Sequence, residues 1–234
     1  MSGPEIYSDN AAAMTASIGH ATETWPGITR ISRPNGTRII LRREVDLDVA
    51  QLLDAEPADR RLTIEDSTSS LTGEAGDGVR VLQMPVMVRA AGTIAPNSPP
   101  AITVTQAADP AALAEAERII VAGFPVVPNP RSPLLPQSVL QQPQWKVWLA
   151  HRDGVAAAAG YTYDDGTAAG VYLLATLPEH RSAGLGRAMM TTAIAAHPNR
   201  HIALVATTAG EPLYLSLGFV KVSTATWYIR AIVD

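Results

Sequence analysis

The sequence predicts a protein of the α+β class, with a mixed, mostly antiparallel sheet flanked by helices. Three observations lead to this class. Asn35-Gly36 stands between two runs rich in β-branched residues, which is a strong hairpin signal because both turn positions need positive φ. Three apolar runs between Trp145 and Thr176 are separated by short glycine-containing turns and predict an antiparallel meander. A helical pattern between two further strand-like runs then predicts one crossover, so the sheet is mixed.

The composition bounds the function classes. The chain has 234 residues, of which 47% are hydrophobic and 17% charged, so it can bury a sizeable core. A net charge of −4 without a basic stripe argues against a broad nucleic-acid surface. No window approaches the length of a membrane-spanning helix, and the N-terminal residues lack the pattern of a secretory signal. We therefore expect no nucleic-acid or membrane partner and a cytoplasmic location.

The chain contains 0 cysteines. Disulfides, thiolate metal sites and a cysteine nucleophile are therefore impossible. No metal site is expected from any other pattern.

The first part of the chain predicts a small α+β domain. In order, we expect a helix from Asp9 or Asn10, the hairpin 28–42, a short helix from Val49 that Pro57 ends, and strands at 62–64 and 79–88. Pro85 lies inside the last run, which favours an edge position or a break. Residues 90–100 combine small residues with three prolines and no charge, as a linker does. We place the boundary there, with domains at 1–95 and 96–234.

The second part is easier to interpret. We expect a strand at 101–105, a helix opened by Asp109-Pro110 and closed by Gly123, and strands at 145–151, 155–163 and 170–176. A helix from about Gly184 to before Pro198, a strand at 202–206, a short helix at 212–217 and closing strands at 219–222 and 226–229 follow. Pro125 to Pro143 is rich in proline and predicts an ordered loop over the site or a short helical piece.

The most informative segment lies between a predicted strand and a predicted helix. It reads Leu177-Pro-Glu-His-Arg-Ser-Ala-Gly-Leu-Gly-Arg-Ala. The first N–H groups of a helix have no internal partner and carry the positive end of its dipole, so an anionic pyrophosphate can bind there. Glycine at 184 and 186 lets the phosphate approach the backbone, and Arg181 and Arg187 can add charged contacts. A tightly packed turn without a ligand would use the same glycines, whereas a dinucleotide fingerprint fails because residue 189 is Met.

A second motif, Ala206-Thr-Thr-Ala-Gly-Glu-Pro-Leu-Tyr-Leu-Ser-Leu-Gly-Phe219, follows the crossover. With both motifs in this order, the sequence resembles the GCN5-related N-acetyltransferase (GNAT) family over about residues 101–230. The resemblance implies an acyl-CoA N-acyltransferase-like fold and acetyl-CoA as acyl donor. Residues 1–95 lack the cofactor motif and are consistent with a degenerate half of the same kind; an unrelated cap is the alternative.

The resemblance also implies roles for individual residues. The pyrophosphate would sit on the backbone N–H groups of a turn made of Arg181, Ser182, Ala183, Gly184, Leu185, Gly186 and Arg187. The pantetheine arm would pair with the backbone near Ala175, Thr176 and Leu177. Tyr214 would protonate the departing thiolate, since thiol and phenol pKa values of roughly 8.5 and 10 make that transfer reasonable. A packing role for Tyr214 is the alternative.

The general base stays unassigned. Family members often place a glutamate on the strand before the glycine turn, whereas here the strand Val171 to Thr176 has no carboxylate. A water relay, Glu179, His151, His180 or an acceptor of lower pKa remain open. The aromatic residues of the meander are expected to complete the core, with some left to line an acceptor pocket together with the proline-rich loop.

The function expected is therefore direct transfer of an acetyl group from CoA to an amine of a small molecule or peptide. The alternative is a non-catalytic acyl-CoA-binding or sensor module, which the missing strand carboxylate favours. A fold that has lost its ligand competes less well, because both glycines stand in a motif with the right flanks. A homodimer is a further expectation.

Overall fold

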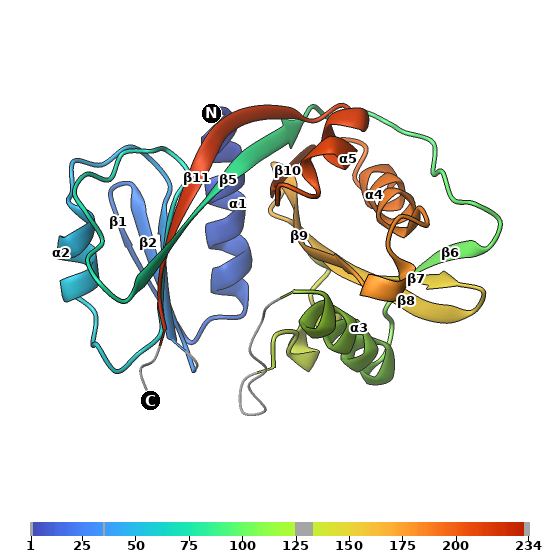
Figure 1. Cartoon of the computed structure of the whole chain (residues 1–234), viewed down its shortest axis with the longest axis horizontal. Coiled ribbons are helices and arrows are strands. Elements are labelled where there is room, and N and C mark those ends of the chain that lie inside the picture. Colours follow the sequence, from blue (N-terminus) through green and yellow to red (C-terminus); the bar gives the residue numbers. More distant parts are fainter. Residues whose placement is uncertain (1, 35, 125–132, 232–234) are drawn as a thin grey trace. The chain divides into compact units, whose positions relative to one another are not determined.

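The computed structural model describes residues 2–34, 36–124 and 133–231 (Figure 1). The chain divides into two compact units. Unit 1 comprises 1–88, 205–214 and 219–234, and unit 2 comprises 89–204 and 215–218. The expected boundary near residue 95 lies close to the first change of unit, but the last strand belongs to unit 1.

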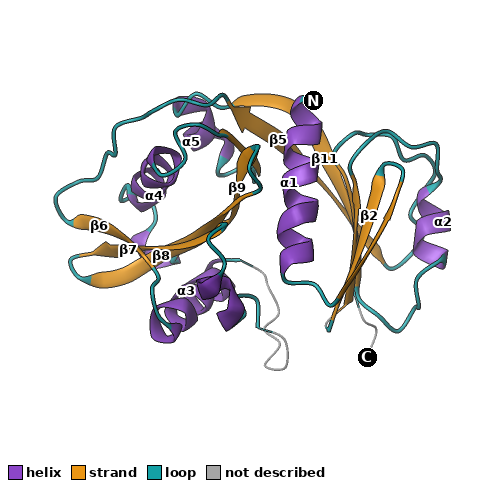
Figure 2. Cartoon of the chain, turned by 180° about the vertical axis from the view of Figure 1, so that it is seen from behind, coloured by secondary structure: helices purple, strands orange, loops and turns teal. Residues whose placement is uncertain are grey.

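Unit 1 is a sheet with a helix on each face, as Figure 2 shows. Its elements are α1 (Gly3–Ser17), β1 (Ala21–Trp25), β2 (Ile28–Arg33), β3 (Gly36–Leu41), α2 (Val49–Asp54), β4 (Leu62–Asp66), β5 (Val79–Arg89) and β11 (Val220–Arg230). The strand order within the unit is β1-β2-β3-β4-β11-β5. Only β3 and β4 pair in parallel; the other neighbours are antiparallel. Val49 and Leu53 of α2 pack with Ile39, Leu62 and Ile64 in the core of one face.

Strand β11 is the reason that unit 1 contains residues from both sides of the expected boundary. It pairs with β4 from Thr226↔Asp66 to Arg230↔Leu62, and with β5 from Val220↔Val88 to Arg230↔Val79. The end of the chain thus fills the place between two strands that come from its first 89 residues. Local sequence patterns do not specify such long-range pairing, which is why a simple cut at 95/96 could not capture it.

Unit 2 contains the meander and the crossover. Its elements are β6 (Ile102–Gln106), α3 (Pro110–Gly123), η1 (Gln137–Gln141), β7 (Trp145–Arg152), β8 (Val155–Asp164), β9 (Ala168–Thr176), η2 (Pro178–His180), α4 (Leu185–Ala195) and β10 (His201–Val205). The strand order is β10-β9-β8-β7-β6, and only β9 and β10 pair in parallel. Helices α3 and α4 cover opposite faces (Figure 1). The predicted fold class, mixed and mostly antiparallel with flanking helices, is confirmed.

Several predicted elements differ from those observed. Helix α1 begins at Gly3 rather than near Asp9, because Pro4 stands in its first turn and the Glu5 carboxylate accepts from the Ser2 N–H at 2.8 Å. Strand β1 was not predicted. Strand β5 runs through Pro85, which pairs with Thr224, without a break.

The two predicted closing strands, 219–222 and 226–229, are one strand. Strand β11 is continuous, with a shift of its pairing to β5 between Lys221 and Ser223. Such a shift is typical of a β-bulge, which interrupts the residue pattern without ending the strand. The polar residues Ser223 and Thr224 therefore suggested a gap where the backbone continues.

The predicted linker packs against unit 2. The Gly92 N–H donates to the Pro198 carbonyl at 2.9 Å, and the Asn97 N–H donates to Thr191 Oγ1 at 3.0 Å. Arg89 Nε donates to the Leu217 carbonyl at 3.0 Å. The segment has no helix or strand, but its backbone is tied to α4 and its neighbours.

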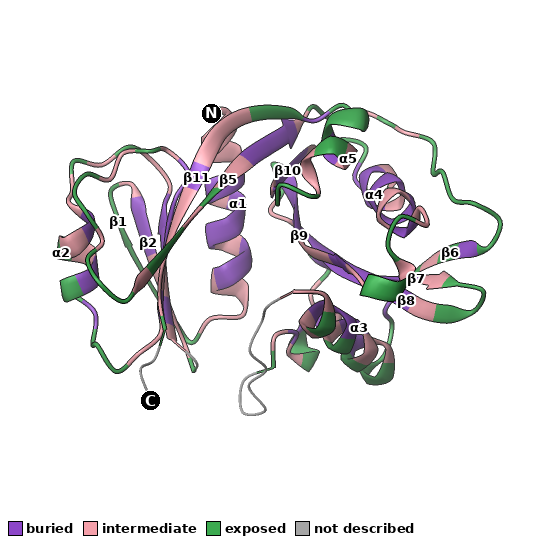
Figure 3. Ribbon diagram, in the orientation of Figure 1, coloured by how far each residue is buried: buried purple, intermediate pink, exposed green. Residues whose placement is uncertain are grey.

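Figure 3 shows burial concentrated on the inner strands of each sheet and on the helix faces that cover them. In unit 2, Leu185, Met189 and Ala193 of α4 pack on Trp148 and Ala158 of the sheet. Within the described residues, no helix is both long and apolar enough to cross a membrane.

Candidate functional site: the turn before helix α4

The turn between β9 and α4 has an unusual backbone. Ser182 has a φ of 60° and Gly184 a φ of 94°, so two of three consecutive residues are left-handed. A Cβ at Gly184 would meet its nearest atom, Pro99 Cγ, at 3.5 Å, so space does not exclude a side chain there. The requirement for glycine is conformational, because the left-handed region costs other residues roughly 1–2 kcal/mol.

The backbone N–H groups of this turn are free. Within the part of the chain that the structure describes, the N–H groups from Ser182 to Arg187 donate no hydrogen bond, and the first bond of α4 runs from the Ala188 N–H to the Gly184 carbonyl at 3.0 Å. Gly184, which precedes the helix, has no side chain to cap it. Free N–H groups at a helix N-terminus favour a bound anion. The turn thus presents free donors to an anion, and the pyrophosphate site stays a prediction.

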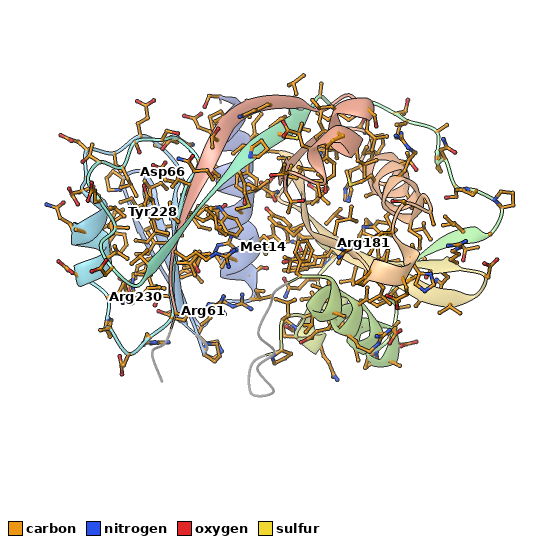
Figure 4. The ribbon with its side chains drawn as sticks, viewed as in Figure 1. Met14, Arg61, Asp66, Arg181, Tyr228 and Arg230 are labelled. Atoms are coloured by element: carbon orange, nitrogen blue, oxygen red, sulfur yellow. The ribbon has the colours of Figure 1, made fainter. Side chains whose placement is uncertain are left out.

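The two arginines of the motif point to different partners. Arg181 is exposed, and its Nε donates to the Thr176 carbonyl at 3.2 Å; Figure 4 labels it. Arg187 donates to Ser216 Oγ at 2.8 Å, which ties the end of α5 (Glu211–Ser216) to α4. Both guanidinium groups retain further donors for an anion at the turn.

Strand β9 has an unpaired edge beside this turn. Its parallel pairing with β10 ends at Gly170↔Ala203, although β9 continues to Thr176. On its other edge β9 stays paired with β8 up to Thr176, and the Leu177 N–H donates to the Ala157 carbonyl at 2.9 Å. Since successive residues of a strand direct their backbone groups to opposite edges, Thr176 directs its groups to the free edge. Of Ala175, Thr176 and Leu177, Thr176 is thus the residue that can pair with an extended ligand, through its N–H in the first place because its carbonyl already accepts from Arg181.

A β-bulge in β9 was not predicted. Ala159 pairs with Ala175 and Tyr161 with Tyr172, so two residues of β9 face Gly160 alone. Leu173 has a φ of 48°, a strained conformation for a leucine. A Cβ at Gly160 would lie 3.0 Å from Leu174 Cα, so a side chain there would push against the backbone of the bulge. A glycine in the interior of a strand run is the signal that could have found it.

Tyr214 lies on α5 and belongs to unit 1. It is 8% exposed, and its ring lies 5.7 Å from that of Phe219. Burial raises the pKa of Tyr214 to about 12. Its hydroxyl makes no hydrogen bond within the described residues. The side chain is therefore protonated at physiological pH, and its hydroxyl is free to donate. This agrees with both roles that the sequence left open, the proton donor and the packing residue.

The structure does not single out one of the candidate bases. Glu179 is exposed, while His151 and His180 are half-buried, and His180 Nδ1 is buried without a partner in the described chain. Strand β9 carries no carboxylate. The described residues include no group of three or more His, Asp or Glu side chains that could hold a metal ion.

The meander aromatics mainly stack on one another. Trp145 and Tyr161 have ring centroids 4.9 Å apart, and Tyr161 and Tyr172 stack at 5.5 Å. All three are buried, as expected for core residues. Of the proline-rich stretch, residues 125–132 lie outside the described residues; the rest includes the 3-10 helix η1.

Comparison with known proteins adds the decisive observation. Residues 143–221, which include β8, β9, the turn and α5, match the sequence model of a family described as "Acetyltransferase (GNAT) domain". Residues 143–221 are thus similar to a GNAT acetyltransferase domain. The resemblance seen in the two motifs is confirmed.

Solved GNAT structures share the fold over the full chain. A GCN5-related N-acetyltransferase from Kribbella flavida is 18% identical, with a TM-score of 0.71 over 98% of this chain and 96% of that one. A GNAT-family acetyltransferase structure from Novosphingobium aromaticivorans is 16% identical, with a TM-score of 0.65 over 100% of both chains. At these identities the likeness concerns the fold alone. No curated protein matches the sequence.

Proposed function

We propose that the protein is an N-acetyltransferase that uses acetyl-CoA as acyl donor and an amine of a small molecule or peptide as acceptor. The observation that carries this proposal is the row of free N–H groups from Ser182 to Arg187 beside the unpaired edge of β9. The free N–H groups can bind a pyrophosphate, and the unpaired strand edge can bind an extended amide chain. The match of residues 143–221 to a GNAT acetyltransferase domain supports this proposal.

The reaction would be a direct transfer. The neutral amine nitrogen attacks the thioester carbonyl, the C–S bond breaks, and the thiolate takes a proton while the new amide loses one. No cysteine is available to hold the acyl group in between. The strained bulge at Leu173 leaves a backbone group outside the β8 ladder. Such a group can orient the thioester, and Tyr214 would supply the proton to sulfur.

The acceptor side is open. An amine resembling lysine would need to lose its proton at a cost of roughly 4–5 kcal/mol at pH 7. Glu179, His151, His180 or a water relay would take that proton. Assembly as a homodimer stays a prediction.

A non-catalytic acyl-CoA-binding module is the second candidate. The observation that favours it is the absence of a carboxylate from β9, Ala168–Thr176. It predicts that acetyl-CoA binds without turnover for every amine tested, whereas the first proposal predicts thiol release with at least one class of amine.

Thermal unfolding with and without acetyl-CoA tests the binding step shared by both candidates. At about 100 times the dissociation constant, binding adds roughly 2.7 kcal/mol, which raises the Tm by on the order of 5–11 °C at this chain length. Gly186→Glu is expected to abolish the shift, because its carboxylate would repel the pyrophosphate. Val155→Glu, at an exposed position of unit 2, is the control and should keep it. No shift for the unaltered protein at millimolar acetyl-CoA would contradict the proposal.

A further inference from the structure

We propose that unit 1 holds a binding site of its own for a small, positively charged amine that also carries hydroxyl groups. The site is a pocket of about 430 Å³ between the loop 67–78 and one face of the sheet. Its lining residues are Asp66, Ser69, Leu71, Gly73, Glu74, Ala75, Val81, Gln83, Thr226 and Tyr228. Nothing in the proposed acetyl transfer uses these residues.

The floor of the pocket is set by strand register. Thr226 of β11 stands opposite Asp66 of β4 on one side and opposite Gln83 of β5 on the other. Tyr228 and Val81 face each other in the next row on the same side of the sheet, since residues two apart share a face. Figure 4 labels Asp66 and Tyr228, which lie near each other on this sheet. Three adjacent strands thus direct polar side chains to one spot.

The wall of the pocket is an ordered loop held by Asp66. One carboxylate oxygen accepts from the Thr68 N–H at 2.9 Å and the Thr68 hydroxyl at 2.8 Å; the other accepts from the Ser70 and Leu71 N–H groups, both at 2.9 Å. Asp66 is 1% exposed. Farther along, Gly73 approaches Asp48 so closely that a Cβ would lie 2.1 Å from a carboxylate oxygen. The loop therefore forms a wall of defined shape.

Three neutral polar groups on the floor have no partner. Within the described residues, the hydroxyls of Thr226 and Tyr228 and the amide of Gln83 make no hydrogen bond. Hydroxyl and amide groups both donate and accept. These side chains therefore suit a ligand that also does both, as a polyhydroxylated molecule does.

The charges of the pocket select a cation. Asp66 and Glu74 line it, and no Lys, Arg or His does. Burial and then the negative charge of Asp66 raise the pKa of Tyr228, as expected for a phenol near a carboxylate. Arg230, on the same face of β11, donates instead to the carbonyls of Leu53, Glu56 and Pro57. An ammonium group is thus attracted and a phosphate repelled. Since the Asp66 oxygens already accept four bonds, Asp66 contributes charge and shape while the other side chains make the contacts.

Calorimetric titration of the full chain with D-glucosamine, D-glucose and D-glucose 6-phosphate tests the proposal without acetyl-CoA. We expect saturable binding of the protonated glucosamine, at least about tenfold weaker binding of neutral glucose, and no binding of the phosphate. Added salt should weaken the glucosamine signal. Absence of saturable glucosamine binding at about 10 mM, in the affinity range of the weakest specific ligands, or preference for the phosphate, would overturn the proposal.

Variants place the binding in this pocket. Tyr228→Phe removes one hydroxyl and should weaken binding about tenfold, whereas Glu74→Gln removes an exposed charge and should weaken it about threefold. Asp77→Asn removes one charge from the same loop at a position that does not line the pocket, and should change nothing. Thermal unfolding without ligand checks that each variant is folded. Glucosamine binding that survives both pocket variants would belong to another site and contradict the inference, whatever the outcome for acetyl-CoA.

Discussion

At the scale of single residues, backbone conformation does more than side-chain chemistry at the candidate site. The motif predicts Gly184 as a residue that lets a phosphate approach the backbone, whereas the structure shows a conformational reason for glycine, a left-handed φ of 94°. Ser182 and Leu173 are left-handed as well, with φ values of 60° and 48°, and neither residue type signals this conformation. Their conformations are imposed by the surrounding turn and bulge, so the sequence alone could not predict them.

Tyr214→Phe tests the proposed proton donor. The variant keeps the ring packed on Phe219 and loses only the hydroxyl. We expect kcat to fall roughly 100-fold, in the range that general acids contribute, while the thermal shift with acetyl-CoA is unchanged. Full activity of the variant would assign Tyr214 a packing role.

The pH profile provides a second test of Tyr214. With its pKa raised to about 12, the phenol stays protonated well above neutral pH, so its ionisation should cause no loss of kcat up to about pH 10. The gap to a CoA thiol near 8.5 would make full proton transfer uphill by about 5 kcal/mol in water-like surroundings. A thiolate leaving in the same buried environment has its own pKa raised, which narrows the gap. An alkaline fall in kcat near pH 9 that disappears in Tyr214→Phe would contradict this account.

At the scale of elements, strand β9 determines where a donor can bind. It is paired on both edges at its start, loses its β10 partner after Gly170, and bulges opposite Gly160. The meander itself was predicted, because tight turns and apolar runs are local signals. The end of the β9–β10 pairing was not, since register between distant segments depends on tertiary packing.

Gly160→Ala should disturb the bulge. The added Cβ would lie 3.0 Å from Leu174 Cα, and backbone cannot move away as a side-chain end can. We expect the free energy of unfolding to fall by about 1–3 kcal/mol and the KM for acetyl-CoA to rise. Urea denaturation and steady-state kinetics measure the two effects. Ala156→Gly, at a half-exposed position of β8, is the control, because it also changes a residue of this strand. It should lower the free energy of unfolding and leave the KM for acetyl-CoA unchanged.

The end of α4 carries a pH-sensitive contact. His197 follows the helix, is 5% exposed, and shares a hydrogen bond of 3.1 Å between its Nε2 and Thr162 Oγ1. Burial lowers the pKa of His197, and Asp164, 3.7 Å from its Nδ1, opposes the shift only in part. The pKa of Asp164 is itself lowered; burial opposes that shift, but the hydrogen bond from Arg200 at 2.8 Å leads the interactions that outweigh it.

These shifts predict a loss of stability in acid. Below about pH 6.5 the unfolded chain protonates His197 while the folded chain resists, so the free energy of unfolding falls with decreasing pH. Asp164 adds a further loss as the pH falls through its lowered pKa. In His197→Gln the loss of unfolding free energy that comes from His197 should disappear. Urea denaturation between pH 5 and about 8, with the exposed His20→Gln as control, measures it; an unchanged slope in His197→Gln would contradict the assignment.

At the scale of the whole molecule, the order of elements along the chain differs from their grouping in space. Most elements of both units were predicted, because periodicity, capping residues and turns are encoded locally. The placement of β11 between β4 and β5 was not, since any strand with alternating residues can fill such a position. The expected domain 1–95 therefore lacks β11, the strand that completes its sheet. In a chain of residues 1–95 alone, β4 and β5 would both lose this partner.

Excision of unit 2 tests this grouping. Val88 and Val220 are paired, so the end of β5 and the start of β11 are neighbours that a short turn can join. A chain of residues 1–89 followed by a glycine-containing turn and residues 219–234 keeps the six strands of unit 1 and omits its segment 205–214 together with unit 2. It should fold, with dispersed amide signals and a cooperative thermal transition. Residues 1–95 alone should not, because β4 and β5 would each expose an unpaired edge. A cooperative transition for 1–95 alone would show that the first 95 residues form a domain without the last strand, as the sequence by itself suggested.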